Sequence, residues 1–220
     1  MTSPNPYDCW LTPPCAALAL RWWLTFRDLG LEPWLDPFAG PGSLVSWGVP
    51  LGREQFGFEL DTRWERELRA CVNAYSFRVG RDSFALDWSV RGQVPHIISN
   101  PPFSRTLDAV ERARDHAFNR QRWACLLMRT DWWQHPNRSR LRPDHMLLLE
   151  WRPVFGLNRH GKFGTDYAGY AWCVWVPIAT GECRVEWLAR PAVPKELVAE
   201  HRRLARLAHQ MGLEAQGATP

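Results

Sequence analysis

The sequence contains no apolar run that approaches the roughly 20 residues needed for a membrane-spanning helix. Its N-terminus, which reads Met-Thr-Ser-Pro-Asn-Pro-Tyr-Asp, lacks the basic and apolar segments of a secretory signal peptide. These two absences predict a cytoplasmic protein with no membrane partner.

Paired cysteines are absent as well. The six cysteines are scattered, and none belongs to a C-x-x-C pair of the kind that zinc and redox sites use. Cys125 and Cys173 lie within apolar runs, where cysteine acts as a small hydrophobic residue. We therefore expect free thiols and no bound metal.

Lysine is nearly absent, because only Lys162 and Lys195 among the 27 Lys and Arg residues are lysines. Genomic base composition can favour arginine, but arginine is also the better residue for binding phosphate and stacking on bases. Residues 102–142 hold nine arginines against four acids, although the net charge of the whole chain is only +4. This local excess is typical of a surface that faces nucleic acid.

The pattern that is present is that of one α/β domain. A hydrophobic fraction of 45% and a charged fraction of 23% are ordinary for a globular protein, and 220 residues suffice for one core. We expect the domain to cover residues 1–211, followed by a disordered tail at 212–220. Short strands alternate with helices, which predicts a doubly wound, mostly parallel sheet. The predicted strands are 32–35, 55–60, 76–79, 96–99 and 123–128, and the predicted helices are 61–74 and 106–118.

The pattern changes after residue 130. The strand-like segments 146–150 and 170–177 follow one another with no helix between them. They predict an antiparallel hairpin at one edge of a sheet that then has seven strands. Residues 194–211 carry apolar side chains at helical spacing and predict a terminal packing helix.

A proline-containing tetrapeptide, Asn100-Pro101-Pro102-Phe103, follows the predicted strand at 96–99. The prolines stiffen the backbone and remove N–H donors. The Asn100 side-chain carbonyl and the Pro101 backbone carbonyl could accept hydrogen bonds from a planar amino group, and Phe103 could stack on the ring that carries it. A proline-rich turn would use the same residue types, so this segment alone leaves both interpretations open.

A glycine-containing loop, Asp36-Pro37-Phe38-Ala39-Gly40-Pro41-Gly42, follows the first predicted strand. Glycine at positions 40 and 42 permits a tight turn and a close approach of the backbone to a ligand. In an open parallel sheet this loop lies at the carboxyl edge, where ligands bind. The third glycine of the dinucleotide fingerprint is missing, and no Gly-Lys-Ser/Thr sequence marks a phosphate loop.

Together these two motifs resemble those of S-adenosylmethionine-dependent amino-methyltransferases of nucleic acids, above all the small phage-type DNA N6-adenine methyltransferases. The resemblance covers roughly residues 8–130. It implies a Rossmann-like class I methyltransferase fold, S-adenosylmethionine as the cofactor and double-stranded DNA as the partner. It also implies a bacterial or phage-infected cell, where such enzymes serve DNA methylation and restriction-modification.

The resemblance further implies roles for single residues. Glu59 would bind the ribose hydroxyls of the cofactor, and Asp82 would accept a hydrogen bond from its adenine amine. The segment that begins at Trp10 would flank the methionine end of the cofactor, and Asp61 is interpreted as a helix cap. The residues implied to bind the cofactor are Trp10, Thr12, Pro13, Asp36, Pro37, Phe38, Gly40, Gly42, Glu59, Asp82 and Asn100.

The implied reaction is methylation of the N6 amine of an adenine flipped out of DNA, with Asn100, Pro101, Pro102 and Phe103 as the catalytic set. The same tetrapeptide would serve an adenine or guanine amine of RNA, the N4 amine of cytosine or a protein glutamine, because each presents a planar NH2 group. A catalytically inert nucleic-acid-binding module is a further alternative. The residues predicted to contact nucleic acid are Arg105, Trp132, Trp133, Arg138, Arg140, Arg159 and Lys162.

Overall fold

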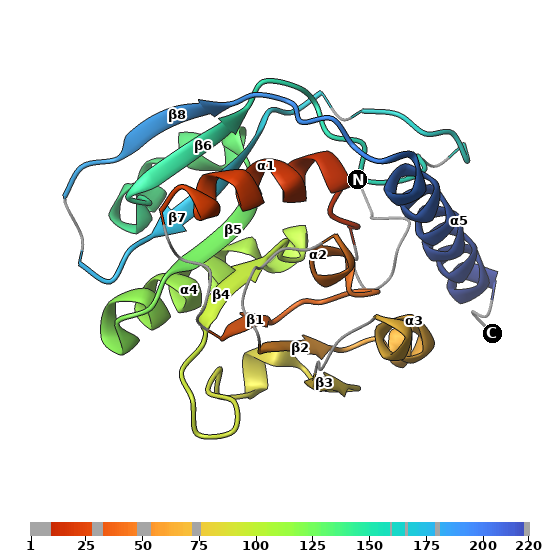
Figure 1. Cartoon of the computed structure of the whole chain (residues 1–220), viewed down its shortest axis with the longest axis horizontal. Helices are drawn as coiled ribbons and strands as arrows, with labels where there is room; N and C mark the ends of the chain where they lie inside the picture. Colours follow the sequence, from red (N-terminus) through yellow and green to blue (C-terminus); the bar gives the residue numbers. More distant parts are fainter. Residues whose placement is uncertain are drawn as a thin grey trace.

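The computed structural model describes residues 10–27, 33–47, 54–71, 76–158, 160–165, 167–178 and 181–217, with side chains described as far as residue 212. These residues form an eight-stranded sheet in the order β3-β2-β1-β4-β5-β7-β6-β8, with helices on both faces (Figure 1). β7 runs antiparallel to its neighbours β5 and β6, and the other pairs of neighbouring strands are parallel. The doubly wound, mostly parallel sheet predicted from the sequence is confirmed. The strands are β1 (Trp34–Asp36), β2 (Gln55–Glu59), β3 (Ser76–Val79), β4 (His96–Ser99), β5 (Ala124–Arg129), β6 (His145–Leu149), β7 (Tyr170–Trp175) and β8 (Arg184–Leu188).

The strand order reverses at β1, and this reversal positions the site. From β1 the chain first builds β2 and β3 on one side, and then returns to build β4 and β5 on the other. β1 and β4 are neighbours, but the segment after β1 leads to β2 on one side and the segment after β4 leads to β5 on the other side. In open parallel sheets, ligands bind in the crevice beside the carboxyl ends of strands at such a reversal.

The sheet has one strand more than predicted. β6 and β7 do pair antiparallel, but β7 also pairs with β5 and so lies inside the sheet rather than at its edge. The edge strand is β8, which pairs in parallel with β6. Its sequence alternates polar and apolar residues, which is the signal that could have predicted it. Its apolar residues Val185 and Trp187 are exposed.

The helices are α1 (Pro14–Thr25), α2 (Ser43–Ser46), α3 (Glu65–Ala70), α4 (Thr106–Arg120) and α5 (Lys195–Gly217), and short 3-10 helices occupy η1 (Thr62–Trp64), η2 (Ser83–Ala85), η3 (Phe103–Arg105), η4 (Thr130–Gln134) and η5 (Pro136–Leu141). The predicted helix 61–74 begins instead as η1. The Asp61 side chain caps η1 by accepting from Arg63 N at 3.0 Å. The chain becomes α-helical only over α3, and residues 72–75 lie outside the described residues.

The predicted disordered tail is wrong for residues 212–217, which belong to α5, and residues 218–220 lie outside the described residues. Met211, the last residue of the predicted helix, contacts the rest of the domain. Its side chain is buried, and its carbonyl accepts a hydrogen bond from Arg63 Nη1 at 2.9 Å. These two contacts anchor the end of α5 on the rest of the domain.

α1 and α4 cover opposite faces of the sheet (Figure 1). α1 starts with Pro14, which is favourable at a first helical position, and buries Leu20 and Trp23. α4 turns its alanines toward the sheet, and these small side chains allow a close approach. The indole N–H of Trp172 donates to the Ala16 carbonyl at 2.9 Å, so this polar group keeps a hydrogen-bond partner although it is buried in the core.

No helix in the described ranges is long and apolar enough to cross a membrane. The same ranges contain no group of three or more side chains that could hold a metal ion. Each cysteine within them is a free thiol.

Candidate active site

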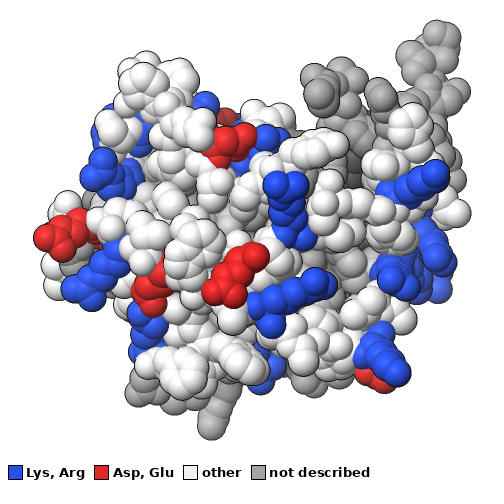
Figure 2. Space-filling view, turned by 90° about the horizontal axis from the view of Figure 1, so that it is seen from above, with Lys and Arg blue, Asp and Glu red and all other residues white. Residues whose placement is uncertain are grey.

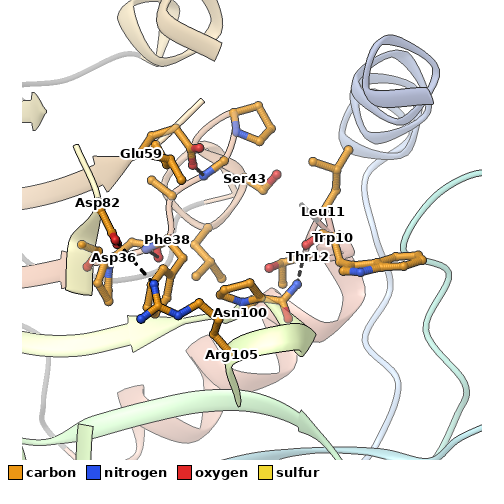
Figure 3. A pocket seen from close by; sticks show the side chains of 18 of the residues that line it. Trp10, Leu11, Thr12, Asp36, Phe38, Ser43, Glu59, Asp82, Asn100 and Arg105 are labelled. Atoms are coloured by element: carbon orange, nitrogen blue, oxygen red, sulfur yellow. Dashed lines mark hydrogen bonds and ion pairs between the residues drawn. The ribbon is translucent and has the colours of Figure 1, made fainter. Parts of the chain in front are cut away.

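A cavity of about 240 Å³, here called the first cavity, lies at the carboxyl ends of β1, β2 and β4. Figure 3 shows Asp36 and Asp82 on one side of it and the segment Trp10 to Thr12 on the other, with Asn100 between them. All the residues predicted to bind a cofactor line this cavity except Pro13 and Gly42. The fold thus brings together side chains from five separate stretches of sequence.

The glycine loop wraps around one end of the first cavity. Gly40 lines it in a left-handed conformation with φ of 55°, and its N–H donates to Glu59 Oε2 at 2.6 Å. Gly42 has φ of 81° and is the N-cap residue of α2. A Cβ atom at Gly42 would lie 2.6 Å from the Cys71 sulfur, so the close packing of the loop on Cys71 requires glycine at this position. Pro13 likewise shapes the chain, because it is the residue before α1.

Two buried carboxyl groups stand at the bottom of the loop. Glu59 accepts a second backbone hydrogen bond, from Asp61 N, at 2.7 Å. Asp36 accepts from the Ser99 hydroxyl at 2.5 Å and from Phe38 N at 3.1 Å. Burial raises the pKa of each carboxyl group to about 7, although these hydrogen bonds act in the opposite direction. Both groups therefore titrate near neutral pH.

The titration of Asp36 predicts that the free energy of unfolding of the wild-type protein and that of the Asp36→Asn variant depend differently on pH. The pKa of Asp36 rises on folding from 3.8 to about 7, so this group stabilises the fold most at low pH and loses that contribution between about pH 4 and 7. An amide keeps the acceptor for Ser99 and Phe38 but has no proton to lose. Relative to wild type, the variant should gain up to ~1.4 kcal/mol in free energy of unfolding per pH unit across this window.

Urea unfolding at several pH values measures this difference. The comparison with wild type is needed because buried histidines such as His96, whose pKa burial lowers to about 4, give a slope of the opposite sign. A free-energy difference that stays constant from pH 4 to 7 would contradict a raised pKa at Asp36.

Asn100 follows β4 and has its side chain oriented by one hydrogen bond. Its Nδ2 donates to the Trp10 carbonyl at 2.5 Å (Figure 3). The side-chain oxygen Oδ1 is buried, and none of the described residues donates to it. Since a buried acceptor without a partner costs free energy, this oxygen marks a place that a ligand's donor could fill.

Asp82 and Arg105 meet at the rim of the first cavity. Arg105 Nη1 lies 3.5 Å from Asp82 Oδ2, as the dashed line in Figure 3 shows. The Arg105 guanidinium also lies 3.6 Å from the centre of the Phe84 ring and pairs with Asp108 at 3.1 Å. Arg105 was predicted to contact nucleic acid, but in this structure it lines the first cavity.

Phe103 does not line the first cavity. Its ring stacks on Trp10 at 5.5 Å between centroids, and it also contacts the rings of Phe155 and Tyr170, each at 6.3 Å. Phe103 is therefore fixed within an aromatic cluster. It lines a second cavity, of about 320 Å³, together with Pro101.

The predicted nucleic-acid residues lie in different places. Trp132 and Arg138 line the second cavity, whereas Trp133 packs against Trp175 at 6.3 Å. Arg140 pairs with Glu111 of α4, Lys162 is exposed in a turn, and Arg159 lies outside the described residues.

Most of the arginines after the tetrapeptide bind groups of the chain itself. On the face seen in Figure 2, basic side chains are spread among neutral ones and do not gather into one groove. The cluster that the composition predicted is thus partly used for internal contacts. Ion pairs join Arg105 to Asp82, Arg120 to Asp87, Arg129 to Asp131 and Arg140 to Glu111, while Arg112, Arg122 and Arg138 donate to backbone carbonyls.

Sequence reasoning missed several residues of the first cavity. Ser43 is the most informative of them, because its buried hydroxyl has no partner among the described residues. Its place directly after the second glycine of the loop was the available signal. The other missed lining residues are Leu11, Ala39, Pro41, Leu44, Leu60, Arg81, Ser83, Phe84 and Ser104.

Comparison with known proteins identifies the fold. No family model matches the chain, and no curated protein sequence matches it. A candidate RNA methyltransferase of Pyrococcus horikoshii is similar in structure, with a TM-score of 0.60 and 16% identity over 80% of this chain and 88% of the other. A candidate class I S-adenosylmethionine-dependent methyltransferase of Listeria monocytogenes gives 0.58 and 10% identity over 93% and 73%. A dimethyladenosine transferase of Plasmodium falciparum gives 0.50 and 13% identity over 77% and 63%. The chain has the Rossmann-like class I methyltransferase fold, as predicted.

Proposed function

We propose that this chain transfers a methyl group from S-adenosylmethionine to the N6 amine of adenine in DNA. The observation that carries the proposal is Asn100 Oδ1, a buried acceptor without a partner in the described part of the chain, in a residue that lines the first cavity. The bond from Asn100 to the Trp10 carbonyl fixes which side-chain atom faces a ligand. An exocyclic amine has two N–H donors and matches this acceptor.

The residues of the first cavity fit S-adenosylmethionine. Glu59 accepts one backbone N–H on each oxygen and keeps further lone pairs for the two hydroxyls of a ribose. The Ser43 hydroxyl offers an additional polar contact, and Gly40 lets the backbone come close. When bound, the cofactor would supply a methyl group on a positively charged sulfur, which leaves as a neutral thioether.

The residues of the tetrapeptide would act on the amine. Asn100 Oδ1 and the Pro101 carbonyl accept its two N–H groups, which localises a lone pair that is otherwise shared with the ring. Transfer would leave the nitrogen with one proton more than the product holds, and Asn100 Oδ1 and the Pro101 carbonyl would keep its N–H groups bound while the surplus proton leaves to water. Positive charge grows on the nitrogen during this step, so fixed acceptors stabilise the transition state more than the ground state.

DNA is the proposed polymer because the motif order and compact length are similar to those of the small phage-type DNA enzymes. RNA is the second candidate, since two proteins with a similar fold are described as a candidate RNA methyltransferase and a dimethyladenosine transferase. The exposed ion pairs after the tetrapeptide are weak enough to be exchanged for phosphate contacts of either polymer.

Labelling with identification of the product tests the proposal. The protein is incubated with methyl-labelled S-adenosylmethionine and, separately, with DNA, RNA and protein, and each polymer is hydrolysed and separated. We expect label in N6-methyladenine from DNA. Label in RNA adenine would favour the second candidate, and label in cytosine or glutamine would contradict adenine as the target. Saturable cofactor binding without any transfer would indicate an inert binding module.

Removal of the Arg105 side chain is expected to raise the affinity of the protein for S-adenosylhomocysteine. In the free protein it pairs with Asp82 and lies over Phe84, so it covers groups that the proposed cofactor would contact. The Arg105→Ala variant should therefore bind S-adenosylhomocysteine about two- to fivefold more tightly, in keeping with the small free energy of an exposed ion pair. Calorimetric titration measures this. The Asp108→Ala variant removes the other partner of Arg105 and should not tighten binding.

A further inference from the structure

Strand β8 forms one edge of the sheet, and no strand in the described part of the chain pairs with its outer side (Figure 1). On its inner side, Arg184 N donates to the Asp144 carbonyl at 2.9 Å. Because peptide groups alternate in direction along a strand, the N–H and C=O groups of Val185 and Trp187 point outward. A free edge of this kind can pair with a further strand.

The side chains of Val185 and Trp187 are also exposed, at 57% and 65%. Their register partners in β6 are Met146 and Leu148, which pack against the core on the face of the sheet that α4 covers. Side chains that share a register position lie on the same face of a sheet. The apolar surface of that face therefore continues to the edge of the sheet and ends in exposed side chains.

Exposed aromatic residues lie beside the same edge on the opposite face, which α1 covers. Trp22 and Phe26, one helical turn apart, are 62% and 85% exposed. Their sequence neighbours fasten α1 to β8, because Glu186 accepts from Trp23 Nε1 at 3.2 Å and from Arg27 Nη2 at 3.0 Å. A partner that covered one face alone would leave one apolar pair in water, whereas a partner strand that continues the sheet would contact both.

We infer that β8 pairs antiparallel with β8 of a second copy of this chain, so that the two sheets join into one. With Val185 at the two-fold axis, Arg184 lies opposite Glu186 of the second copy, which is a favourable cross-strand pair. With the axis at Glu186, two carboxylates would lie opposite each other, which is unfavourable. In the Val185 register β8 is therefore complementary to itself, as a two-fold interface requires.

The size of the contact suits a weak, reversible dimer. Since a buried aromatic side chain covers about 150–250 Å², the exposed parts of Trp22, Phe26 and Trp187 offer on the order of 400 Å² per copy. The paired strands and Val185 add to this area, so the two copies together reach the roughly 1,000 Å² at the lower end of specific interfaces. We expect a dissociation constant in the micromolar range.

The direction of β8 sets how the two active sites are arranged. β5 and β6 both run antiparallel to β7, so β6 and β8 run in the same direction as β1 and β4. An antiparallel dimer would therefore point the carboxyl edges of its two sheets, and with them the two first cavities, in opposite directions. Each copy would act on its own substrate, so loss of the dimer should leave the activity of each chain unchanged.

Sedimentation velocity at rising protein concentration tests the association. We expect a species of twice the mass of one chain to accumulate across the micromolar range. Val185→Lys would place two like charges at the axis, so it should weaken the dimer at least about tenfold. The matched control is Leu107→Lys, because Leu107 is an exposed apolar residue of α4 and not of the β8 edge; this variant should dimerise like wild type.

Oxidative cross-linking tests the register. Antiparallel residues that exchange hydrogen bonds have Cα atoms about 5.5 Å apart, which a disulfide can join. Val185→Cys should therefore form a disulfide between two copies under a mild oxidant. Wild-type protein should not be joined through Cys183, because in this register Cys183 lies opposite Trp187 of the second copy.

Three results would overturn the inference: a wild-type chain that stays monomeric at high micromolar concentration, a dimer that persists unchanged in Val185→Lys, or a Val185→Cys variant that gives no cross-link. Urea unfolding of each variant shows whether it is folded, and if Val185→Lys is not, the cross-link of Val185→Cys decides. Neither measurement uses methyl transfer, so this inference and the proposed function fail independently.

Discussion

The Asn100→Ala variant is expected to lose most methyl transfer, with kcat reduced by about 10²–10³-fold, while its affinity for S-adenosylhomocysteine stays nearly unchanged. The variant removes Oδ1, a fixed acceptor for charge that develops only in the transition state, and such groups change kcat by about 10²–10³. Affinity should persist because the side-chain amide of Asn100 donates to the Trp10 carbonyl and not toward the rest of the first cavity. Single-turnover transfer and calorimetric titration measure the two quantities.

The Asn100→Asp variant is the matched control. A carboxylate keeps the shape of the residue and an acceptor at Oδ1, but it cannot donate to the Trp10 carbonyl. We expect activity between that of wild type and Asn100→Ala. Full activity in Asn100→Ala would contradict the proposed function. If Asn100→Ala also failed to bind S-adenosylhomocysteine, its low activity would reflect a collapsed first cavity. The activity of Asn100→Asp would then test whether an acceptor at Oδ1 is needed for transfer.

The Gly42→Ala variant is expected to lose about 2–4 kcal/mol in free energy of unfolding. The residue has φ of 81°, which strains any side chain, and a Cβ atom there would lie 2.6 Å from the Cys71 sulfur and 3.3 Å from Leu68 Cδ2. Leu68 is fully buried, so it has little room to move. Urea unfolding measures the loss, and a shifted loop should also weaken S-adenosylhomocysteine binding.

Gly92 supplies the control for this variant. It has φ of 76°, close to that of Gly42, but a Cβ atom at Gly92 would meet nothing within 4 Å. The Gly92→Ala variant should therefore cost only the conformational strain, about 1–2 kcal/mol. Equal losses at the two positions would show that Cys71 and Leu68 move aside at little cost.

The sequence predicted those parts of the site that follow strands. Asp36 ends β1, Glu59 ends β2 and Asn100 directly follows β4, and parallel strands bring their carboxyl ends to one edge of the sheet. These three strands were predictable because each is a short run of buried residues. For the same reason the order of motifs along the chain was enough to place these side chains around one cavity.

The remaining features depend on contacts between distant segments. No local pattern shows that Arg105 folds back onto Asp82 rather than outward, or that Phe103 is enclosed by Trp10 and Tyr170. The sequence shows how many arginines follow the tetrapeptide, but it does not show that nearby acids and backbone carbonyls bind most of them. Strand β8 carries a short alternating pattern, but its place at the edge of the sheet depends on pairing in parallel with β6, a distant segment.

The hydrogen bond between Asn100 and Trp10 joins residues 90 positions apart in the sequence. Bonds of this kind close long loops and form late in folding, after the local helices and neighbouring strands. During synthesis the Trp10 segment leaves the ribosome well before its partner exists. The amide that would hold the substrate therefore reaches its working orientation only when both ends of this loop have docked, so methylating capacity would report completion of folding rather than formation of the sheet.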